Sequence, residues 1–383
     1  MKSLGLSLLM LALTGVASAA SPRTGFYNNA DGSPIAGLIA GARESVEMEI
    51  YEMDDPTVID ALREAKGRGV KIHIVQESKP VGASCHVFEA SVDTGQPHHA
   101  SGAVSCEGQR AFVKEINAGG GSYVPFQREV LCPGGKSCFE HGKIAVVDRK
   151  FALITTGNFN VSNLCDAAAS PESCDRDFSY VSNDRDVVDG LSRILEADFA
   201  GERFAMSPAA QRKLTVSPNS LDSLTAFLDS AQESIQLENQ YLKEPGLNAV
   251  LERAAKRGVK VSVMVASACS FGHPKPSEVK TLTAIFEGFD AAGISTRMFT
   301  RNMLVNGHAG YLHAKAIVVD GNHAWLGSIN GSAESFFHNR EFGIYFDSAE
   351  DVAGLASVLS ADFSDSRGES WSEGLDCAED AHK

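Results

Sequence analysis

Two short segments of the chain place a histidine and a lysine two residues apart, ahead of an apolar run that ends on aspartate. They are HGKIAVVD, which begins at His141, and HAKAIVVD, which begins at His313. The apolar runs predict strands, and residues two apart in a strand face the same side, so Lys143 and Lys315 accompany their histidines. An imidazole can act as a nucleophile or move a proton, and an ammonium group can hold an anion. The two pairs therefore indicate two parts of an active site.

Further polar residues follow each pair at matching positions. Asp148 and Asp320 lie at the predicted strand ends, and a glycine directly after Asp320 is typical of a hairpin turn. We therefore expect both aspartates to be structural, bonding turn amides or a neighbouring charge. The returning strands lead to Gly-x-x-Asn in both copies, which should bring Asn160 and Asn330 back beside the His–Lys pairs.

The elements that must position these residues are also repeated. Residues 44–72 (ESVEMEIYEMDDPTVIDALREAKGRGVKI) align without a gap with residues 233–261 (ESIQLENQYLKEPGLNAVLERAAKRGVKV). Each copy predicts an alternating strand, a Pro at a helix start, an amphipathic helix and a buried second strand. Closing helices are expected at 186–199 and 351–363. This order predicts an α/β fold with a mostly parallel or mixed sheet in each half.

The repeat predicts two similar halves packed as a pseudo-two-fold monomer, with the active site between them. The first half would span 20–210 and the second 211–383, and the Ser/Pro-rich run near 205–220 is expected to be linker-like. The first half has extra residues between the matched motifs, and six of the eight cysteines lie in these expansions. They are either loops pinned by disulfides or a lid that shapes substrate access.

Residues 1–19 are predicted to be a signal peptide, because one Lys precedes a short apolar stretch that ends on small residues. We therefore expect an exported bacterial protein, either periplasmic or secreted. An even number of cysteines in such a chain favours disulfides over metal binding. Pairing of sequence neighbours is our expectation, although the spacing leaves other pairings open. It would give Cys85–Cys106, Cys132–Cys138, Cys165–Cys174 and Cys269–Cys377.

The pattern H-x-K-x4-D followed by G-[SN]-x-N, present twice, resembles the phospholipase D superfamily of phosphodiesterases. The resemblance covers essentially the whole chain after the signal peptide, since the repeated strand–helix units fit as well as the motifs do. It implies that both motifs meet at one active site between the halves. One histidine would attack phosphorus to form a phospho-histidine intermediate, and the other would protonate the leaving group, with neither metal nor cofactor.

The resemblance also implies a role for each motif residue. His141 is expected to be the nucleophile, and His313 the acid that later acts as base toward water or an alcohol. The two histidines would then need different pKa values. The groups expected to hold the phosphate oxygens are Lys143, Lys315 and the amides of Asn160 and Asn330.

Two carboxylates are expected to orient the imidazoles. The segments DRDFSY (175–180) and NREFGI (339–344) align, and they supply Asp177 and Glu341. Glu341 lies where the family has the carboxylate that bonds its catalytic histidine, whereas Asp177 is one carbon shorter. The first half also has Asn158 where the second has Ser328, and both are candidates for substrate binding.

The expected substrate is a phospholipid at a membrane surface, with an alcohol as a possible acceptor. The stretch LENQYL (237–242) resembles one that recurs in phospholipases D, and residues 240–261 are similar to cardiolipin synthases and related phosphatidyl transferases. The net charge of −15 argues against an electrostatic grip on nucleic acid. The alternative is an exported endonuclease acting on DNA or RNA. Nucleases of this superfamily resemble shorter one-motif chains that dimerise, whereas this chain carries both motifs and is expected to be a monomer.

Overall fold

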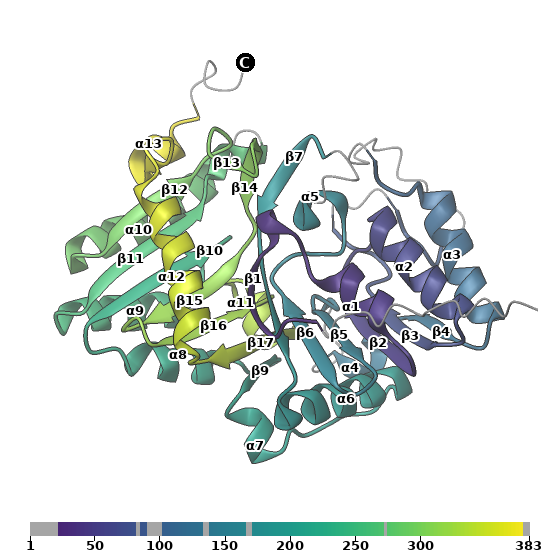
Figure 1. The fold of residues 1–383 in the computed structure, drawn as a ribbon. Coiled ribbons are helices and arrows are strands. Elements are labelled where there is room, and N and C mark those ends of the chain that lie inside the picture. Colours follow the sequence, from purple (N-terminus) through teal and green to yellow (C-terminus); the bar gives the residue numbers. More distant parts are fainter. Residues whose placement is uncertain are drawn as a thin grey trace, which may run out of the picture.

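The computed structural model describes residues 22–81, 85–89, 102–132, 138–165, 171–271 and 274–377. Two mixed sheets lie side by side, one in each half of the chain (Figure 1). The seven-stranded sheet has the order β1 (Gly25–Asn28), β8 (Phe178–Ser182), β6 (Phe151–Thr155), β5 (Lys143–Val147), β2 (Ser45–Ile50), β3 (Lys71–Gln76) and β4 (Ser122–Pro125). The eight-stranded sheet has the order β18 (Glu369–Ser370), β12 (Ser295–Phe299), β11 (Lys260–Ala266), β10 (Ser234–Asn239), β15 (Lys315–Val319), β16 (His323–Gly327), β17 (Glu341–Phe346) and β9 (Leu214–Ser217).

Helices pack on both faces of each sheet (Figure 1). Those of the first half are α1 (Ile35–Gly41), α2 (Pro56–Gly67), α3 (Cys106–Ala118), α4 (Arg128–Leu131), α5 (Val161–Leu164) and α6 (Arg185–Ala200). Those that follow are α7 (Pro208–Gln211), α8 (Leu221–Asp229), α9 (Pro245–Lys256), α10 (Pro276–Ala292), α11 (Ala333–Phe337), α12 (Ala349–Ser364) and α13 (Trp371–Leu375). None of the helices described is long and apolar enough to cross a bilayer.

The repeated segments form the same local unit twice. The strands β2 and β3 run parallel and are joined by α2, and β10 and β11 run parallel and are joined by α9. Both helices begin with Pro directly after an acidic N-cap, and the carboxylate of Asp55 accepts from the Thr57 N–H at 2.8 Å. These caps satisfy amide groups at the helix start, so the turn and the helix begin at the positions that the sequence predicts.

The halves share an apolar core. Alternation along β5 points Ile144 and Val146 toward α6, whereas Ala145 and Val147 face the cluster beneath α1 and α2. The cluster that contains Ile144 also holds residues of β15, β17 and α12 from the second half, so a single core spans both sheets. A third sheet also joins the halves, because β7 (Ser173–Arg176) runs parallel to β14 (His308–Leu312), which pairs with β13 (Leu304–Val305). The predicted α/β architecture of two similar halves is confirmed.

The segment expected to be a linker is ordered. Within 205–220 the chain forms α7 and then β9, which pairs antiparallel with β17 at the edge of the eight-stranded sheet. The alternation of Leu214 and Val216 suits this edge position, because the Leu214 side chain is buried in the shared core. The expectation of a linker was wrong, since Ser and Pro here mark the starts and ends of short elements.

All four expected disulfides are present. They join Cys85 to Cys106, Cys132 to Cys138, Cys165 to Cys174 and Cys269 to Cys377. The first three lie in the expanded segments of the first half, which agrees with the interpretation of these segments as loops pinned by disulfides. The lid interpretation and the signal peptide concern residues 82–84, 90–101, 133–137, 166–170 and 1–21, which lie outside the described residues.

Candidate active site

The two His–Lys segments lie where the halves join. His141 lies two residues before the start of β5, and His313 lies two residues before the start of β15; both are central strands of the two sheets. The His141 N–H donates to the carbonyl of Arg340 at 2.9 Å, and the His313 N–H donates to the carbonyl of Arg176 at 3.3 Å. Each histidine is therefore fixed by its own strand and by the main chain of the opposite half.

The orienting carboxylates are exchanged between the halves. Nδ1 of His141 lies 2.8 Å from Oε2 of Glu341, and Nδ1 of His313 lies 3.0 Å from Oδ1 of Asp177. A carboxylate at Nδ1 favours the tautomer with a proton on that atom and leaves Nε2 as the nitrogen that can react. Asp177 and Glu341 thus lie where an orienting carboxylate is expected, and each serves the histidine of the other half.

Both lysines lie in the interior beside their histidines. Lys143 and Lys315 are each 0 % exposed, and each donates from Nζ to the carbonyl of the histidine two residues before it. Burial lowers the pKa of Lys143 to about 7 and that of Lys315 to about 8. Two ammonium groups this poorly solvated would gain strongly from an anion placed between them.

The pKa values of the two histidines are lowered to a similar extent in the site without substrate. Burial lowers the pKa of His141 to about 4 despite Glu341, and it lowers the pKa of His313 to about 4 despite Asp177. Conversely, the histidines hold the pKa of Glu341 and Asp177 below their ordinary values even though burial alone would raise them. The expected separation of the two histidine pKa values is therefore not found, because both rings are desolvated alike.

The amide and hydroxyl candidates occupy different surroundings in the two halves. Asn160 is the N-cap of α5, and its Oδ1 accepts from the Asn163 N–H at 3.1 Å. Asn330 is buried, and its Oδ1 has no hydrogen-bond partner among the residues that the structure describes. Nδ2 of Asn158 lies 3.5 Å from a carboxylate oxygen of Glu52, whereas Ser328 accepts from the Phe342 N–H at 3.0 Å directly behind Glu341. Their predicted roles toward substrate remain predictions.

Sequence reasoning missed four residues on the first-half side of the site. The ring of Tyr51 packs edge-on against His141, with centroids 4.8 Å apart. Burial raises the pKa of Glu52, Asp54 and Asp175 to about 7 in each case. The repeat carried a signal for two of them, because the alignment of 44–72 with 233–261 sets Glu52 against a tyrosine and Asp54 against a lysine. The two sides of the site therefore differ in charge.

A cavity of about 290 Å³ lies on the second-half side, between the ends of β10 and β11 and helix α10. Apolar side chains form much of its wall, and they are Leu242, Val265, Leu282, Phe286 and Met298. Lys243 and Lys275 also line it. The Gln240 N–H donates to the carbonyl of Ala314 at 3.2 Å, and the preceding residue, Asn239, pairs in register with Lys315. The cavity therefore adjoins the second His–Lys pair.

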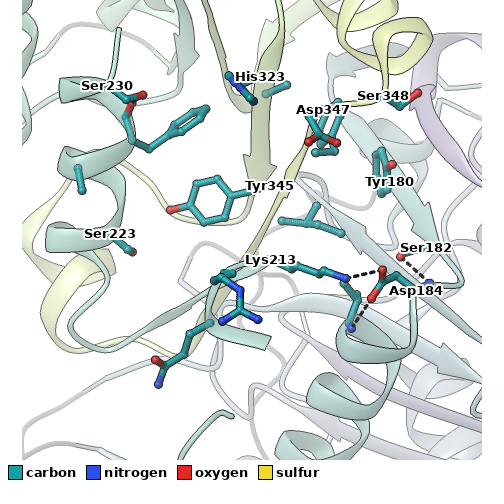
Figure 2. A pocket seen from close by; sticks show the side chains of 18 residues that line it. Tyr180, Ser182, Asp184, Lys213, Ser223, Ser230, His323, Tyr345, Asp347 and Ser348 are labelled. Carbon is teal, nitrogen blue, oxygen red and sulfur yellow. Dashed lines mark hydrogen bonds and ion pairs between the residues drawn. The ribbon is translucent and has the colours of Figure 1, made fainter. Parts of the chain in front are cut away.

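A larger cavity, of about 780 Å³, lies at the other end of the strands that carry the orienting carboxylates (Figure 2). Its wall includes Tyr180 of β8, Tyr345 near the end of β17, and Lys213, whose Nζ lies 2.5 Å from Oδ2 of Asp184. None of the predicted site residues lines this cavity. We therefore place the candidate chemistry at the opposite end of these strands.

The motif aspartates tie neighbouring loops to the strand ends. Asp148 accepts from the N–H groups of residues 43–45, at 2.7–3.0 Å. Asp320 accepts from those of residues 232–234, at 2.8–3.2 Å. Both aspartates have positive φ and lie in hairpin turns. This geometry gives them a structural position, since each satisfies the amides that lead into β2 or β10.

Replacing Asp320 with alanine should lower the free energy of unfolding by about 1–3 kcal/mol, because three backbone amides lose their acceptor. The amide bonds hold the pKa of Asp320 below its ordinary value, so its contribution is present above the unfolded pKa and is lost as the pH falls through the folded value. Denaturant unfolding between neutral and acid pH measures both effects. Asp189→Ala, on the exposed face of α6, is the matched control, and an Asp320→Ala protein as stable as this control would contradict the structural role.

Comparison with known proteins agrees with this geometry. The family model described as "Cardiolipin synthase, PLD-like domain" matches residues 35–198 and 224–364, which together make up most of the chain. A curated protein from Bacillus subtilis (strain 168), probable cardiolipin synthase YwiE, is 25% identical over 147 residues. That match covers 37% of this chain and 26% of the relative, so the aligned part spans about a quarter of the relative's length.

Solved structures share the fold. Phosphatidylserine synthase from Haemophilus influenzae Rd KW20 superimposes with a TM-score of 0.60 at 13% identity, covering 91% of this chain and 88% of that one. Polyphosphate kinase from Porphyromonas gingivalis gives a TM-score of 0.57 at 15% identity, covering 86% of this chain and 47% of that one. At these identities the similarity concerns the fold alone.

Proposed function

Because the chain belongs to the phospholipase D superfamily, in the family described as "Cardiolipin synthase, PLD-like domain", we propose that it is a metal-independent phosphodiesterase that transfers or hydrolyses phosphatidyl groups. One observation carries the proposal: two His–Lys pairs with buried lysines lie at the junction of the halves, and each imidazole is bonded by a carboxylate from the opposite half. Such an arrangement offers one imidazole as nucleophile, a second imidazole that can carry a proton once an anion is bound, and the charge of two lysines, without a metal ion.

The proposed reaction has two steps. Nε2 of His141 attacks phosphorus, the bond from phosphorus to the head-group oxygen breaks, and His313 gives its proton to that oxygen. Water or an alcohol then attacks the phosphatidyl-histidine, passes its proton to His313, and releases His141. The anionic phosphate held by Lys143 and Lys315 would favour the imidazolium form of His313, which supplies the acid that the unliganded site lacks.

A lipid substrate is supported by the cavity beside the second His–Lys pair. Its wall combines apolar side chains with Lys275 and with an ion pair in which Lys243 Nζ lies 2.5 Å from Oε1 of Glu278. The apolar part of this wall suits an acyl segment of a lipid. The overall negative charge of the chain disfavours a polyanionic substrate. An endonuclease remains the second candidate, since the phosphodiester chemistry would be the same.

Turnover of phosphatidylglycerol or phosphatidylcholine in EDTA should therefore be observed, and a primary alcohol should divert product from phosphatidic acid to the phosphatidyl alcohol. Chromatography of the lipid products measures both outcomes, and DNA and RNA are incubated in parallel. Nucleic-acid cleavage without lipid turnover would refute the lipid assignment. A strict need for added divalent metal would refute the mechanism.

The cavity beside the second His–Lys pair should also make the enzyme prefer lipid substrates with long acyl chains. Ala268, which lines it, is replaced with phenylalanine to fill part of the space. We expect kcat/KM for a long-chain phosphatidyl substrate to fall about tenfold and that for a dihexanoyl analogue to change little. Ala291→Phe, at an exposed position of α10, is the control. Equal losses on both lipids would contradict binding of the acyl segment in this cavity.

We further propose that the protein acts outside the cytoplasm as a monomer, with a signal peptide at residues 1–19 and halves at 20–210 and 211–383. The four disulfides support an oxidising compartment. The presence of both motifs in one chain supports a site complete in one copy. Fractionation of expressing cells and light scattering of the purified protein test the two statements separately.

A further inference from the structure

An arginine directly precedes each orienting carboxylate and reaches into the opposite half. Arg176, next to Asp177, places Nη2 2.9 Å and Nε 2.6 Å from the two carboxylate oxygens of Asp362 on α12. Arg340, next to Glu341, places Nη2 2.8 Å and Nε 2.7 Å from those of Asp198 on α6. In both pairs Nη2 donates a hydrogen bond to one carboxylate oxygen, whereas Nε forms a close ion-pair contact with the other oxygen without hydrogen-bond geometry. A largely buried aspartate therefore anchors each guanidinium.

Each pair includes a second buried acid from a central strand. Glu238 of β10 lies beside Asp362, and Glu49 of β2 lies beside Asp198. Both glutamates are at most 1 % exposed, and burial next to another carboxyl raises the pKa of both well above the ordinary value. The Arg340 cluster also contains buried Glu140, whose pKa burial likewise raises well above the ordinary value. Each arginine thus lies among buried carboxyl groups, whose negative charge offsets part of the cost of burying the guanidinium.

The same arginines also hold the histidines through their main chain. The Arg176 carbonyl accepts from the His313 N–H, and the Arg340 carbonyl accepts from the His141 N–H. In each half an Arg–acid dipeptide therefore contacts the opposite half three times, by its guanidinium, its carbonyl and the neighbouring carboxylate. A rotation of the dipeptide would shift the histidine backbone and its imidazole partner together.

We infer that Arg176 and Arg340 are positioning residues for the reaction proposed above, each aligning the catalytic histidine of the opposite half by anchoring its dipeptide to the buried Glu–Asp pair of that half. Arg340 serves the nucleophile His141, and Arg176 serves the acid His313. The inference rests on the proposed function, and it assigns separate chemical steps to two residues that lie outside the reacting atoms.

Two lipid substrates whose leaving groups differ in basicity can distinguish a positioning role in one chemical step from a general effect on protein stability. Departure of p-nitrophenol needs little protonation, whereas departure of glycerol needs a proton from His313. The comparison uses kcat/KM, which reports the steps up to departure of the head group, because His313 also acts as base in the later attack by water. Arg176→Lys should therefore lower kcat/KM about 10–100-fold on phosphatidylglycerol and much less on phosphatidyl-p-nitrophenol. Arg340→Lys should lower kcat/KM by a similar factor on both lipids, because attack by His141 is required for either leaving group.

Two further sets of variants distinguish a loss of positioning from partial unfolding or a nonspecific loss of activity. Asp362→Asn and Asp198→Asn loosen the same anchors at constant volume, and they should reproduce the patterns of Arg176→Lys and Arg340→Lys. Arg297→Lys is the matched control, since this arginine donates to the carbonyls of Phe363 and Gly368 within the second half. It should show no dependence on the leaving group, and thermal unfolding reports the stability of every variant.

Four outcomes are distinguishable. The predicted patterns support the positioning roles, and the reverse assignment of the two patterns supports positioning but exchanges the roles of His141 and His313. Equal losses on both lipids for all four variants, following only their thermal stability, would overturn the inference. No turnover of either lipid by the unmodified protein would refute the proposed function, and with it the positioning roles assigned for that reaction.

Discussion

His141→Ala is expected to lower kcat by at least about 10⁴-fold, the scale seen when a residue of a catalytic unit is removed. Alanine supplies no nitrogen to attack phosphorus, so the covalent step cannot occur and only binding and positive charge remain. Initial rates with a fluorescent phosphatidyl substrate measure the loss. Acid quenching of the unmodified enzyme during turnover, followed by mass spectrometry, should locate the phosphatidyl group on the peptide that contains His141.

Two comparisons make this result specific. His323→Ala, at an exposed position at the start of β16, should retain activity within about twofold, as surface changes usually do. His313→Ala should lose turnover of alkyl head groups to a similar extent as His141→Ala. A fully active His141→Ala enzyme would refute the nucleophile assignment, and trapping of the phosphatidyl group on His313 would exchange the two roles.

Glu341→Gln is expected to lower kcat by about 10³–10⁴-fold while preserving the fold, by analogy with triads in which an amide replaces the orienting carboxylate. The amide can present its NH₂ group to Nδ1 of His141 and so favour the unreactive tautomer. It also removes the negative charge that stabilises positive charge on the ring. Asp177→Asn should impair His313 in the same way, and comparison of the two variants measures how evenly the exchanged carboxylates contribute.

The Glu341 variant also has a predicted pH signature in stability. His141 and Lys143 hold the pKa of Glu341 below its ordinary value, so the ionised carboxylate stabilises the fold above the unfolded pKa. That contribution is lost as the pH falls through the folded pKa, and the glutamine variant never has it. Unfolding curves should therefore diverge least in acid and most near neutral pH. Parallel curves across this range would contradict a charged Glu341.

The repeat and the motif spacing predicted the elements of the fold well, for physical reasons. The strand period places His313 and Lys315 together, and Pro after an acidic N-cap sets the start of α2 and α9. Three of the disulfides join cysteines that are 21, 6 and 9 residues apart, whereas Cys269–Cys377 spans 108 residues. All of these features except this last disulfide depend on local geometry, which the sequence contains.

The exchange of carboxylates and the arginine anchors depend on how the halves pack, which periodicity does not determine. Arg176 and Arg340 nevertheless occupy matching positions in the repeat, as do Asp198 and Asp362 in the segments EADF and SADF. A charged residue that recurs in both halves at the end of an apolar helix or strand could therefore have predicted a buried ion pair. The histidine pKa values could not be predicted, because they depend on desolvation and on the phosphate charge.

The exchanged contacts bear on the ancestry of the chain. Two identical copies of one half, arranged about a true two-fold axis, would form the same reciprocal contacts between separate molecules. Fusion of the two copies would leave each histidine dependent on a carboxylate encoded in the other copy. Neither copy could then be deleted or decay without disabling the other, whereas the surrounding loops could diverge independently. The acidic surroundings of Tyr51 and the lysine-lined cavity beside β10 are differences of the kind that such constrained duplication permits.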